Sequence, residues 1–400
     1  MRQRFLNTSA RTPWPLLALL MATTAIGPAT LNMLLPALPH LVVLLAADAS
    51  VVQLTLSLYL LSLATAQLFL GPLSDRFGRR PVLLAGLALN VGASIAAIAA
   101  HSIAMLIAAR MLQAIGASAG IVIGRAIVRD LFARERAAAM LGLVTTAMVV
   151  APMVAPLIGG LLVTGFGWEA IFVCIAALSS LVFVWAFVVL PETHAPGAHD
   201  SGRLLLKEWA ELFRHRKFYG FVLCGALASA PFFTVIGGGP HVVVTLMQRT
   251  PPEYGMWFAL GSLGYMAGNF TVSRLSERFG IDAMIAAGAA VEIAGAIVSL
   301  VLVDVAWELG PFVIFGPQLL ISYGNGLVLP SAIAGAVSIR PQAAGSAAGL
   351  TGFTQMSIGA AVTQIVPLAL AGAETAMPMA WMVLAVAAAT GVAYVGLVRR

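Results

Sequence analysis

The segment Gly71–Pro81, which reads GPLSDRFGRRP, is one half of a pattern that the chain uses twice. Its centre, SDRFG at residues 74–78, returns as SERFG at residues 276–280. A second pair of segments, PHLVV at 39–43 and PHVVV at 240–244, recurs at nearly the same spacing. Self-similarity at a fixed spacing indicates repeated structural units, so the sequence predicts two halves built on one plan.

The composition places both halves in a membrane. The chain has 400 residues, of which 60% are hydrophobic and 10% charged, and its mean hydropathy is +0.97. Soluble domains carry about 25% charged residues. The stretch Ala137–Trp168 has no charged residue in 32 positions, whereas roughly 20 apolar residues suffice to cross the hydrocarbon core. Because lipid satisfies no backbone polar group, we expect an all-α integral membrane protein.

Charges and Gly/Pro punctuation divide the chain into twelve expected spans. The first apolar run is too long for a signal-peptide core, so we interpret it as a retained helix. The expected spans lie at residues 14–38, 51–71, 81–100, 104–124, 138–163, 168–190, 218–240, 254–273, 281–303, 309–334, 344–370 and 376–397.

The positive charges test this segmentation. Lys and Arg collect in cytoplasmic loops, and with both termini cytoplasmic all but Arg110 and Arg249 of the 22 basic residues fall on that side. Arg249 is in an outside loop and Arg110 is within a span. The net charge of +6 therefore reports topology and contact with anionic headgroups rather than nucleic-acid binding. We expect the lipid bilayer and a small-molecule substrate to be its partners.

The longest polar segment separates six spans from six. We predict a six-helix bundle over residues 1–190, a cytoplasmic linker over 191–217 and a second six-helix bundle over 218–400. Within the linker, Leu204–Arg216 has the apolar spacing of a short amphipathic helix on the membrane surface. Cys174 and Cys224 fall in apolar stretches, so we expect two buried thiols and no disulfide.

The repeated segment also resembles a known signature. GPLSDRFGRRP, placed between the second and third spans, resembles the signature loop of the major facilitator superfamily. The resemblance implies two pseudo-symmetric six-helix bundles around a central cavity and a gating latch on the inner side. In this latch, glycines allow close helix approach and a tight turn, and charged side chains contact helix ends and headgroups. The latch residues are Gly71, Asp75, Arg76, Gly78, Arg79 and Arg80.

Two further motifs narrow the resemblance. The segment Arg110–Gly116 resembles the buried-arginine motif of proton-linked members, and the segment 151–160 resembles the antiporter motif, a kinked packing surface carrying Pro152, Pro156, Gly159 and Gly160. The whole chain is similar to the Bcr/CflA group of drug-resistance efflux transporters. The resemblance implies a monomer in a bacterial inner membrane that exports drug-like compounds, with the proton as coupling ion and no cofactor.

The sequence departs from that group at Asn32. An aspartate usually precedes the Leu-Pro-Ala-Leu-Pro segment of the first helix there, and asparagine cannot titrate or attract cations. Arg110 and Glu292 are then the ionisable residues, histidines aside, deep within spans. We interpret Glu292 as structural, because the ninth helix of this fold is a supporting one. Arg110, with Asn32 and Gln113 as partners, favours neutral, zwitterionic or anionic substrates; alternatively, backbone carbonyls satisfy it and it only joins two helices.

Other polar and aromatic residues on the pore-lining helices of the resembled fold suit a mixed pocket. Any one of them can equally serve a neighbouring helix. These candidates are Tyr59, Met148, Phe232, Phe233, Tyr265, Asn269, Tyr323, Asn325 and Gln355, with Gln53 and Thr354 beside them. The run Gly237–Pro240 predicts a bend that ends the seventh span.

The repeat places His40 and His241 symmetrically. With Met247 they could form an entry site for a copper-like ion, although Pro-His at a helix end is more often a cap facing water. An importer of a nutrient or transition-metal ion on the same fold therefore remains the alternative function, and a sensing role stays open. An enzyme is not expected, since the chain has no His-Glu-x-x-His run, no Gly-x-Ser-x-Gly elbow and no pair of intramembrane aspartates.

Overall fold

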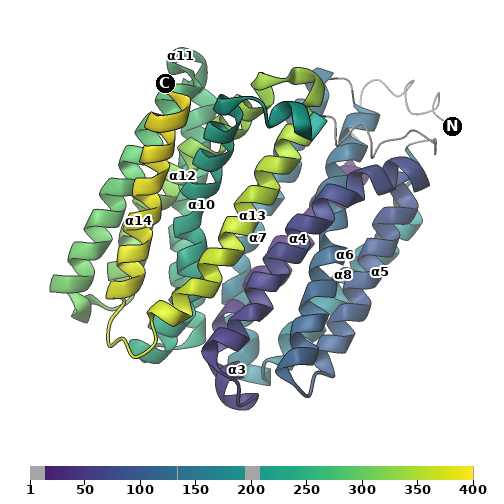
Figure 1. Cartoon of the computed structure of the whole chain (residues 1–400). Coiled ribbons are helices and arrows are strands. Elements are labelled where there is room, and N and C mark those ends of the chain that lie inside the picture. Colours follow the sequence, from purple (N-terminus) through teal and green to yellow (C-terminus); the bar gives the residue numbers. More distant parts are fainter. Residues whose placement is uncertain (1–13, 133, 194–207, 400) are drawn as a thin grey trace.

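The protein is a bundle of long helices (Figure 1). The computed structural model describes residues 14–132, 134–193 and 208–399. Its elements are α2 (Trp14–Met33), η1 (Leu35–Ala37), α3 (Leu38–Leu44), α4 (Ala49–Phe77), α5 (Arg79–Ile98), α6 (Ile103–Leu131), α7 (Arg134–Phe166), α8 (Glu169–Val189), α10 (Arg216–Pro240), η2 (His241–Leu246), α11 (Pro251–Val305), η3 (Trp307–Leu309), α12 (Phe312–Ile339), η4 (Pro341–Ala343), α13 (Ala344–Ala369), α14 (Met377–Ala393) and η5 (Tyr394–Val398).

The expected spans all correspond to helices. Within the described residues, 10 helices are long and apolar enough to cross a membrane. One of them, α11, has 55 residues and contains two expected spans, which meet at Gly280 where φ is 80°. Helix α13 is not among the 10, but it coincides with the expected span 344–370. The fold class is therefore confirmed as an all-α integral membrane protein.

The repeated signature is helical rather than a loop. Helix α4 continues through Phe77, α5 starts at Arg79, and Gly78 alone interrupts them with φ of 96°. The expected loop over residues 71–81 is therefore wrong in extent, because one glycine in the left-handed region turns the chain. Gly280 repeats this device. The bend expected to end the seventh span at Pro240 is also displaced, since η2 continues it as a π-helix to Leu246.

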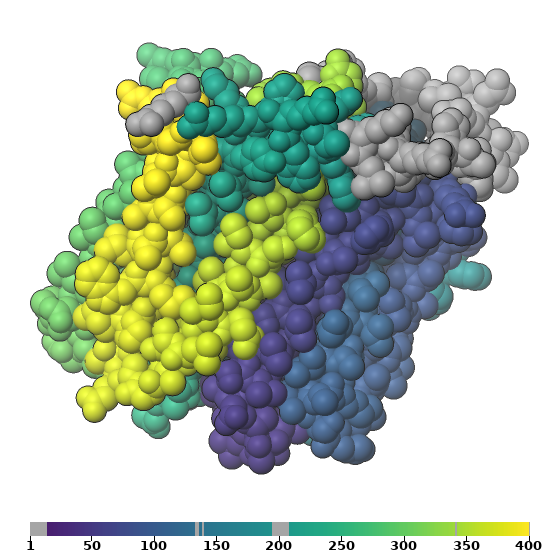
Figure 2. Space-filling model, in the orientation of Figure 1, coloured from purple at the N-terminus to yellow at the C-terminus, as the bar shows by residue number. Residues whose placement is uncertain are grey.

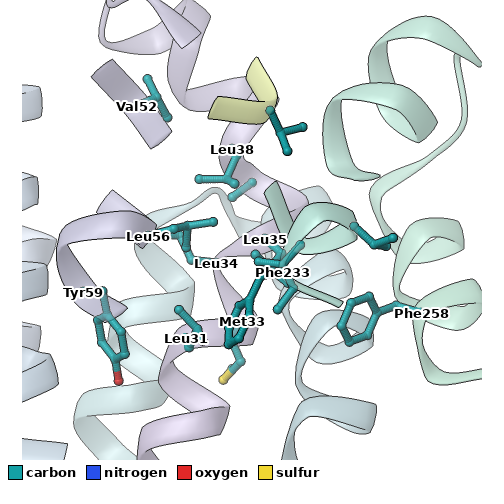
Figure 3. Close-up of a cluster of buried hydrophobic side chains, with 14 of the residues drawn as sticks. Leu31, Met33, Leu34, Leu35, Leu38, Val52, Leu56, Tyr59, Phe233 and Phe258 are labelled. Carbon is teal, nitrogen blue, oxygen red and sulfur yellow. The ribbon is translucent and has the colours of Figure 1, made fainter. Parts of the chain in front are cut away.

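The apolar core divides along the helix axes. We call the end with Arg79 and the start of α10 the basic end, and the end with α3 the opposite end. Toward the basic end, one buried cluster joins α2, α4, α5, α6, α7 and α8, and a separate one joins α10, α11, α12, α13 and α14. Toward the opposite end a single cluster joins both sets of helices (Figure 3). We call α2–α8 the N half and α10–η5 the C half.

Contacts between the halves follow two seams. Helices α4 and α13 cross the front of the molecule side by side, and their surfaces touch in the space-filling view (Figure 2). Helices α7 and α11 form the second seam. Of the predicted amphipathic helix, Leu204–Arg216, residues 204–207 lie outside the described chain. Residues 208–212 are helical, but residues 213–214 form a turn and α10 begins at Arg216, so the helix is shorter than predicted. This short helix bonds the C half through Glu208 to Ser346 and Glu211 to Arg340.

Glycines set the closest helix crossings. A Cβ on Gly120 of α6 would overlap the carbonyl oxygen of Thr23 on α2. A Cβ on Gly255 of α11 would lie 2.5 Å from the backbone of Leu157 on α7. In lipid, helices associate through such close packing because burial of apolar surface gives little gain.

We expect Gly120→Ala to lower the free energy of unfolding by about 1–3 kcal/mol, because the added methyl overpacks a helix crossing. Thermal unfolding of the purified protein in detergent measures the effect. The control is Gly92→Ala on α5, where an added Cβ has nothing within 4 Å. Equal melting temperatures for the two variants would contradict this account of the crossing.

Candidate functional site

Arg110 is the centre of a polar cluster inside the N half. Its side chain is fully buried. The Nη1 group donates to the carbonyl oxygen of Thr30 at 3.1 Å and to Oε1 of Gln113 at 2.9 Å. The guanidinium carbon lies 4.3 Å from the ring centroid of Tyr59, whose hydroxyl donates to the carbonyl oxygen of Gly27 at 3.0 Å. One side chain thus joins α2, α4 and α6 through a charge-assisted bond and a cation–π contact.

The cluster extends to α5 and α8. Nε2 of Gln113 donates to Oγ of Ser94 at 2.7 Å. Nδ2 of Asn90 donates to the carbonyl oxygen of Gln113 at 3.0 Å, and Oγ of Ser179 donates to Oδ1 of Asn90 at 2.8 Å. Among these residues, sequence reasoning named Arg110 and Gln113 but missed the two serines and Asn90, which resemble ordinary small or packing residues of a span.

Two donors and one acceptor near this cluster have no partner within the described chain. They are Nε and Nη2 of Arg110 and Oδ1 of Asn32. Asn32 is buried as expected, but its Nδ2 donates to the carbonyl oxygen of Pro28 at 2.7 Å, and no bond joins it to Arg110. The backbone-carbonyl interpretation of Arg110 is therefore met only in part, because two of its three nitrogens keep their hydrogen-bonding capacity.

In the C half, a polar chain brings two of the candidates together. Nε2 of Gln355 on α13 donates to Oγ of Ser229 on α10 at 2.9 Å. The same Oγ lies 3.4 Å from Oδ1 of Asn325 on α12. Ser229 links the three helices and was not singled out from the sequence.

The remaining candidates are dispersed. Tyr323 donates to Oγ1 of Thr271, and Asn269 donates to the carbonyl of Tyr265 on its own helix. Phe232 packs 5.6 Å from Phe233, centroid to centroid, in the core that both halves share. Figure 3 shows Phe233 and Phe258 facing residues of the first helix there. Met148 is half-buried, and its Sδ lies 3.3 Å from Nη2 of the exposed Arg125.

The latch residues form a network at the basic end of the N half. The guanidinium of Arg79 contacts Asp75 at 2.6 Å, Asp130 at 3.1 Å and Oγ of Ser74 at 2.6 Å. The carboxylate of Glu192 accepts the backbone N–H groups of Arg79 at 2.9 Å and Arg80 at 3.2 Å.

The Glu192 carboxylate therefore caps α5 at its positive dipole end. Arg80 also donates to the carbonyl of Phe187 at 2.7 Å. Arg76 lies 5.2 Å from the ring of Phe77, and Gly71 faces Val122 of α6. Asp130 and Glu192 were not predicted. Within the described chain, the partners of Arg79 and Arg80 lie on α4, α6 and α8 and in the segment that follows α8.

The proline- and glycine-rich motif of α7 packs against two helices. A Cβ on Gly159 would overlap the backbone of Met33, and one on Gly160 would lie 2.7 Å from the carbonyl oxygen of Pro251. Pro152 and Pro156 lie inside α7. The motif therefore lies where α7 meets both the first helix and the second seam.

The α4–α13 seam carries polar bonds near the opposite end. Oγ of Ser57 donates to Oε1 of Gln364 at 2.7 Å, and Nε2 of Gln364 donates to the carbonyl oxygen of Ser50 at 2.8 Å. Beside it lies a cavity of about 170 Å³ between the halves. Pro39, Gln53, Pro240 and His241 are among its lining residues.

The three residues of the alternative metal entry site differ in exposure. His241 is half-buried, His40 is exposed and Met247 is half-buried. In the part of the chain that the structure describes, no group of three or more His, Cys, Asp or Glu residues could hold a metal ion. Cys174 and Cys224 are free thiols; Cys224 is buried as expected, whereas Cys174 is only half-buried.

Known proteins resemble the chain along its length. It is 30% identical to the "Uncharacterized MFS-type transporter YdgK" of Bacillus subtilis over 392 residues, covering 96% of this chain and 95% of the relative. It is 27% identical to the "Bicyclomycin resistance protein homolog" of Haemophilus influenzae, covering 82% of each. It is 30% identical to "Multidrug resistance protein D" of Escherichia coli, covering 87% and 86%.

Structure comparison gives the same fold. A bacterial homologue of the human lysosomal transporter Spinster, in an inward-facing and unoccupied conformation, matches with a TM-score of 0.70 and 14% identity, covering 98% of this chain and 96% of that one. The sequence profile of the Major Facilitator Superfamily matches residues 20–364. The chain is a multi-pass membrane transporter, not an enzyme, and it belongs to the major facilitator superfamily, where its relatives include drug-resistance efflux proteins.

Proposed function

We propose that this protein exports small organic compounds, neutral or anionic rather than lipophilic cations, by proton antiport with alternating access. The basic end then faces the cytoplasm, since Lys and Arg collect there. Relatives named for resistance to bicyclomycin and chloramphenicol support export of antibiotic-like compounds.

The division of the apolar core is the observation that carries alternating access. The halves share one buried cluster near the opposite end and have separate clusters near the basic end. A transporter closed to the outside and parted toward the cytoplasm has this arrangement. The latch network supports the same state, because in the described chain Arg79 and Arg80 bond residues of the N half and of the segment directly after α8.

The charge of the site supports the substrate class. Asn32 replaces the acid that would attract cations, and two buried nitrogens of Arg110, Nε and Nη2, have no acceptor in the described chain. Buried donors favour a ligand that brings an acceptor, because an unpaired polar group costs free energy. Arg125, exposed beside Met148, places a further cation on the same helix as Arg110.

We expect proteoliposomes with an acidic interior to accumulate chloramphenicol and fluorescein, but not ethidium or copper ions, through molecules whose basic end faces outward. Arg110→Ala should lower uptake, because it removes the cation that joins α2, α4 and α6. Asp75→Asn should lower uptake less, because Arg79 keeps its ion pair with Asp130. Uptake of labelled compound against time is measured. Movement that ignores the gradient would remove the antiport proposal, and preferential ethidium uptake would remove the substrate class.

We expect Gln364→Leu to open the opposite end. It removes two hydrogen bonds between the halves, worth about 1 kcal/mol each, and so shifts the equilibrium about tenfold or more toward the open state. The readout is maleimide labelling of Val52→Cys, a position 2% exposed here, with both native cysteines replaced by serine. The control is Gln248→Leu, whose amide bonds only the carbonyl of Thr245 in its own turn. Equal labelling rates for the two variants would show that the seam bonds do not hold this gate.

A further inference from the structure

Glu292 occupies the place in the C half that Asn90 occupies in the N half. Gly86 and Asn90 on α5 recur as Gly288 and Glu292 on α11, at the same spacing as the SDRFG and SERFG segments. The helix crossings match as well. A Cβ on Gly116 of α6 would lie 2.5 Å from the carbonyl oxygen of Gly86, and one on Gly324 of α12 would lie 2.5 Å from that of Gly288.

The two positions differ in their partners. The side chain of Asn90 is bonded by Ser179 and bonds the carbonyl of Gln113. Glu292 is fully buried, and neither carboxylate oxygen has a hydrogen-bond partner among the described residues. A structural carboxylate in a membrane span is normally paired with a cation or a donor, so this arrangement argues against a purely structural role.

The described residues that α10, α12 and α14 place around Glu292 include no cation. From α10, the titratable group that faces it is the buried thiol of Cys224. On α12 the single titratable residue is Tyr323, whose hydroxyl is bonded to Thr271. The adjoining stretch of α14, residues 383–387, is apolar, and Tyr394 and Asp282 lie farther along toward the basic end.

An ionised carboxylate in these surroundings would carry a desolvation cost of several kcal/mol without compensation. In the conformation seen here the group therefore holds a proton. The other acidic residues of the described chain lie in the first or last turn of a helix, beside the kink at Gly280, or in connections. Glu292 is thus the carboxyl group placed at mid-span in that part of the protein.

Helix α12 connects this carboxyl group with the candidate substrate region. Gly324 packs against the backbone and side chain of Glu292, and the next residue, Asn325, belongs to the polar chain with Ser229 and Gln355. If a ligand that binds Asn325 or Gln355 shifts α12, the packing of Gly324 on Glu292 changes with it, and with it the access of water to the carboxyl group. Pro317 and Pro330 inside α12 give it points at which to bend.

We propose that Glu292 is the proton-binding site of the transport cycle, loaded in the conformation seen here and discharged to water at the basic end when α12 moves. The inference rests on the proposed proton antiport. The step moves one proton between a carboxyl oxygen and water and breaks no other bond.

Purified full-length protein in proteoliposomes tests it with labelled chloramphenicol. Glu292→Gln should keep counterflow exchange measured without a gradient. It should lose the accumulation that a pH gradient drives, which is about tenfold per pH unit for one proton per cycle. Glu292→Asp should keep part of the coupling. The matched control is Glu277→Gln, an exposed glutamate of the SERFG segment, which should behave as the parent protein.

The outcomes separate the two proposals. A parent protein without gradient-driven accumulation would end the proposed antiport, whereas a parent and a Glu292→Gln variant coupled equally would end the role of Glu292 alone. A folded Glu292→Gln variant that also loses counterflow would make the residue structural. Infrared spectra need no substrate: the band of a protonated carboxyl group should vanish in Glu292→Gln, and its absence from the parent protein would overturn the loaded state.

Discussion

Close approach of helix backbones at glycine is the constraint on which this structure depends. Lipid offers helices no gain from burying apolar side chains, so dispersion contacts at short range must hold them. Gly120 against Thr23, Gly116 against Gly86 and Gly324 against Gly288 are such crossings. They fix the distance between neighbouring helices within a half. Polar side chains such as Arg110 and Gln113 can then span from one helix to the next with short hydrogen bonds.

Because close contacts hold each half together, movement is expected between the halves, at the two seams. The bonds of Gln364 and the glycine contacts between α7 and α11 lie between the halves, whereas the networks of Arg79 and Arg110 lie within one of them. Such a separation of contacts lets one set break while the other persists. It is the physical condition for rocking of one bundle against the other, and the glycine turns at Gly78 and Gly280 confine the connections to single residues.

The sequence predicted the number of spans and the repeat because both depend on local composition. It was wrong about where two helices end. The expected spans stop at residues 71 and 124, ahead of the charged Asp75 and Arg125, whereas α4 and α6 continue past both. It also missed Glu192, which reaches the start of α5 only after the chain has passed through four helices. Ser94 and Ser229 escaped notice because a serine in a span carries no signal of the partner it meets. Arg110 could be named because a charge within an apolar span is rare, and Gln113 because it lies in the same motif.

The cavity beside the α4–α13 seam depends on the separation of the halves. Its walls come from both of them, Pro39 and Gln53 on one side and Pro240 and His241 on the other. When the halves part at that end, these walls move apart and the cavity is lost as a binding space. A compound that fills it therefore favours the conformation closed at this end, because it binds one state better than the other.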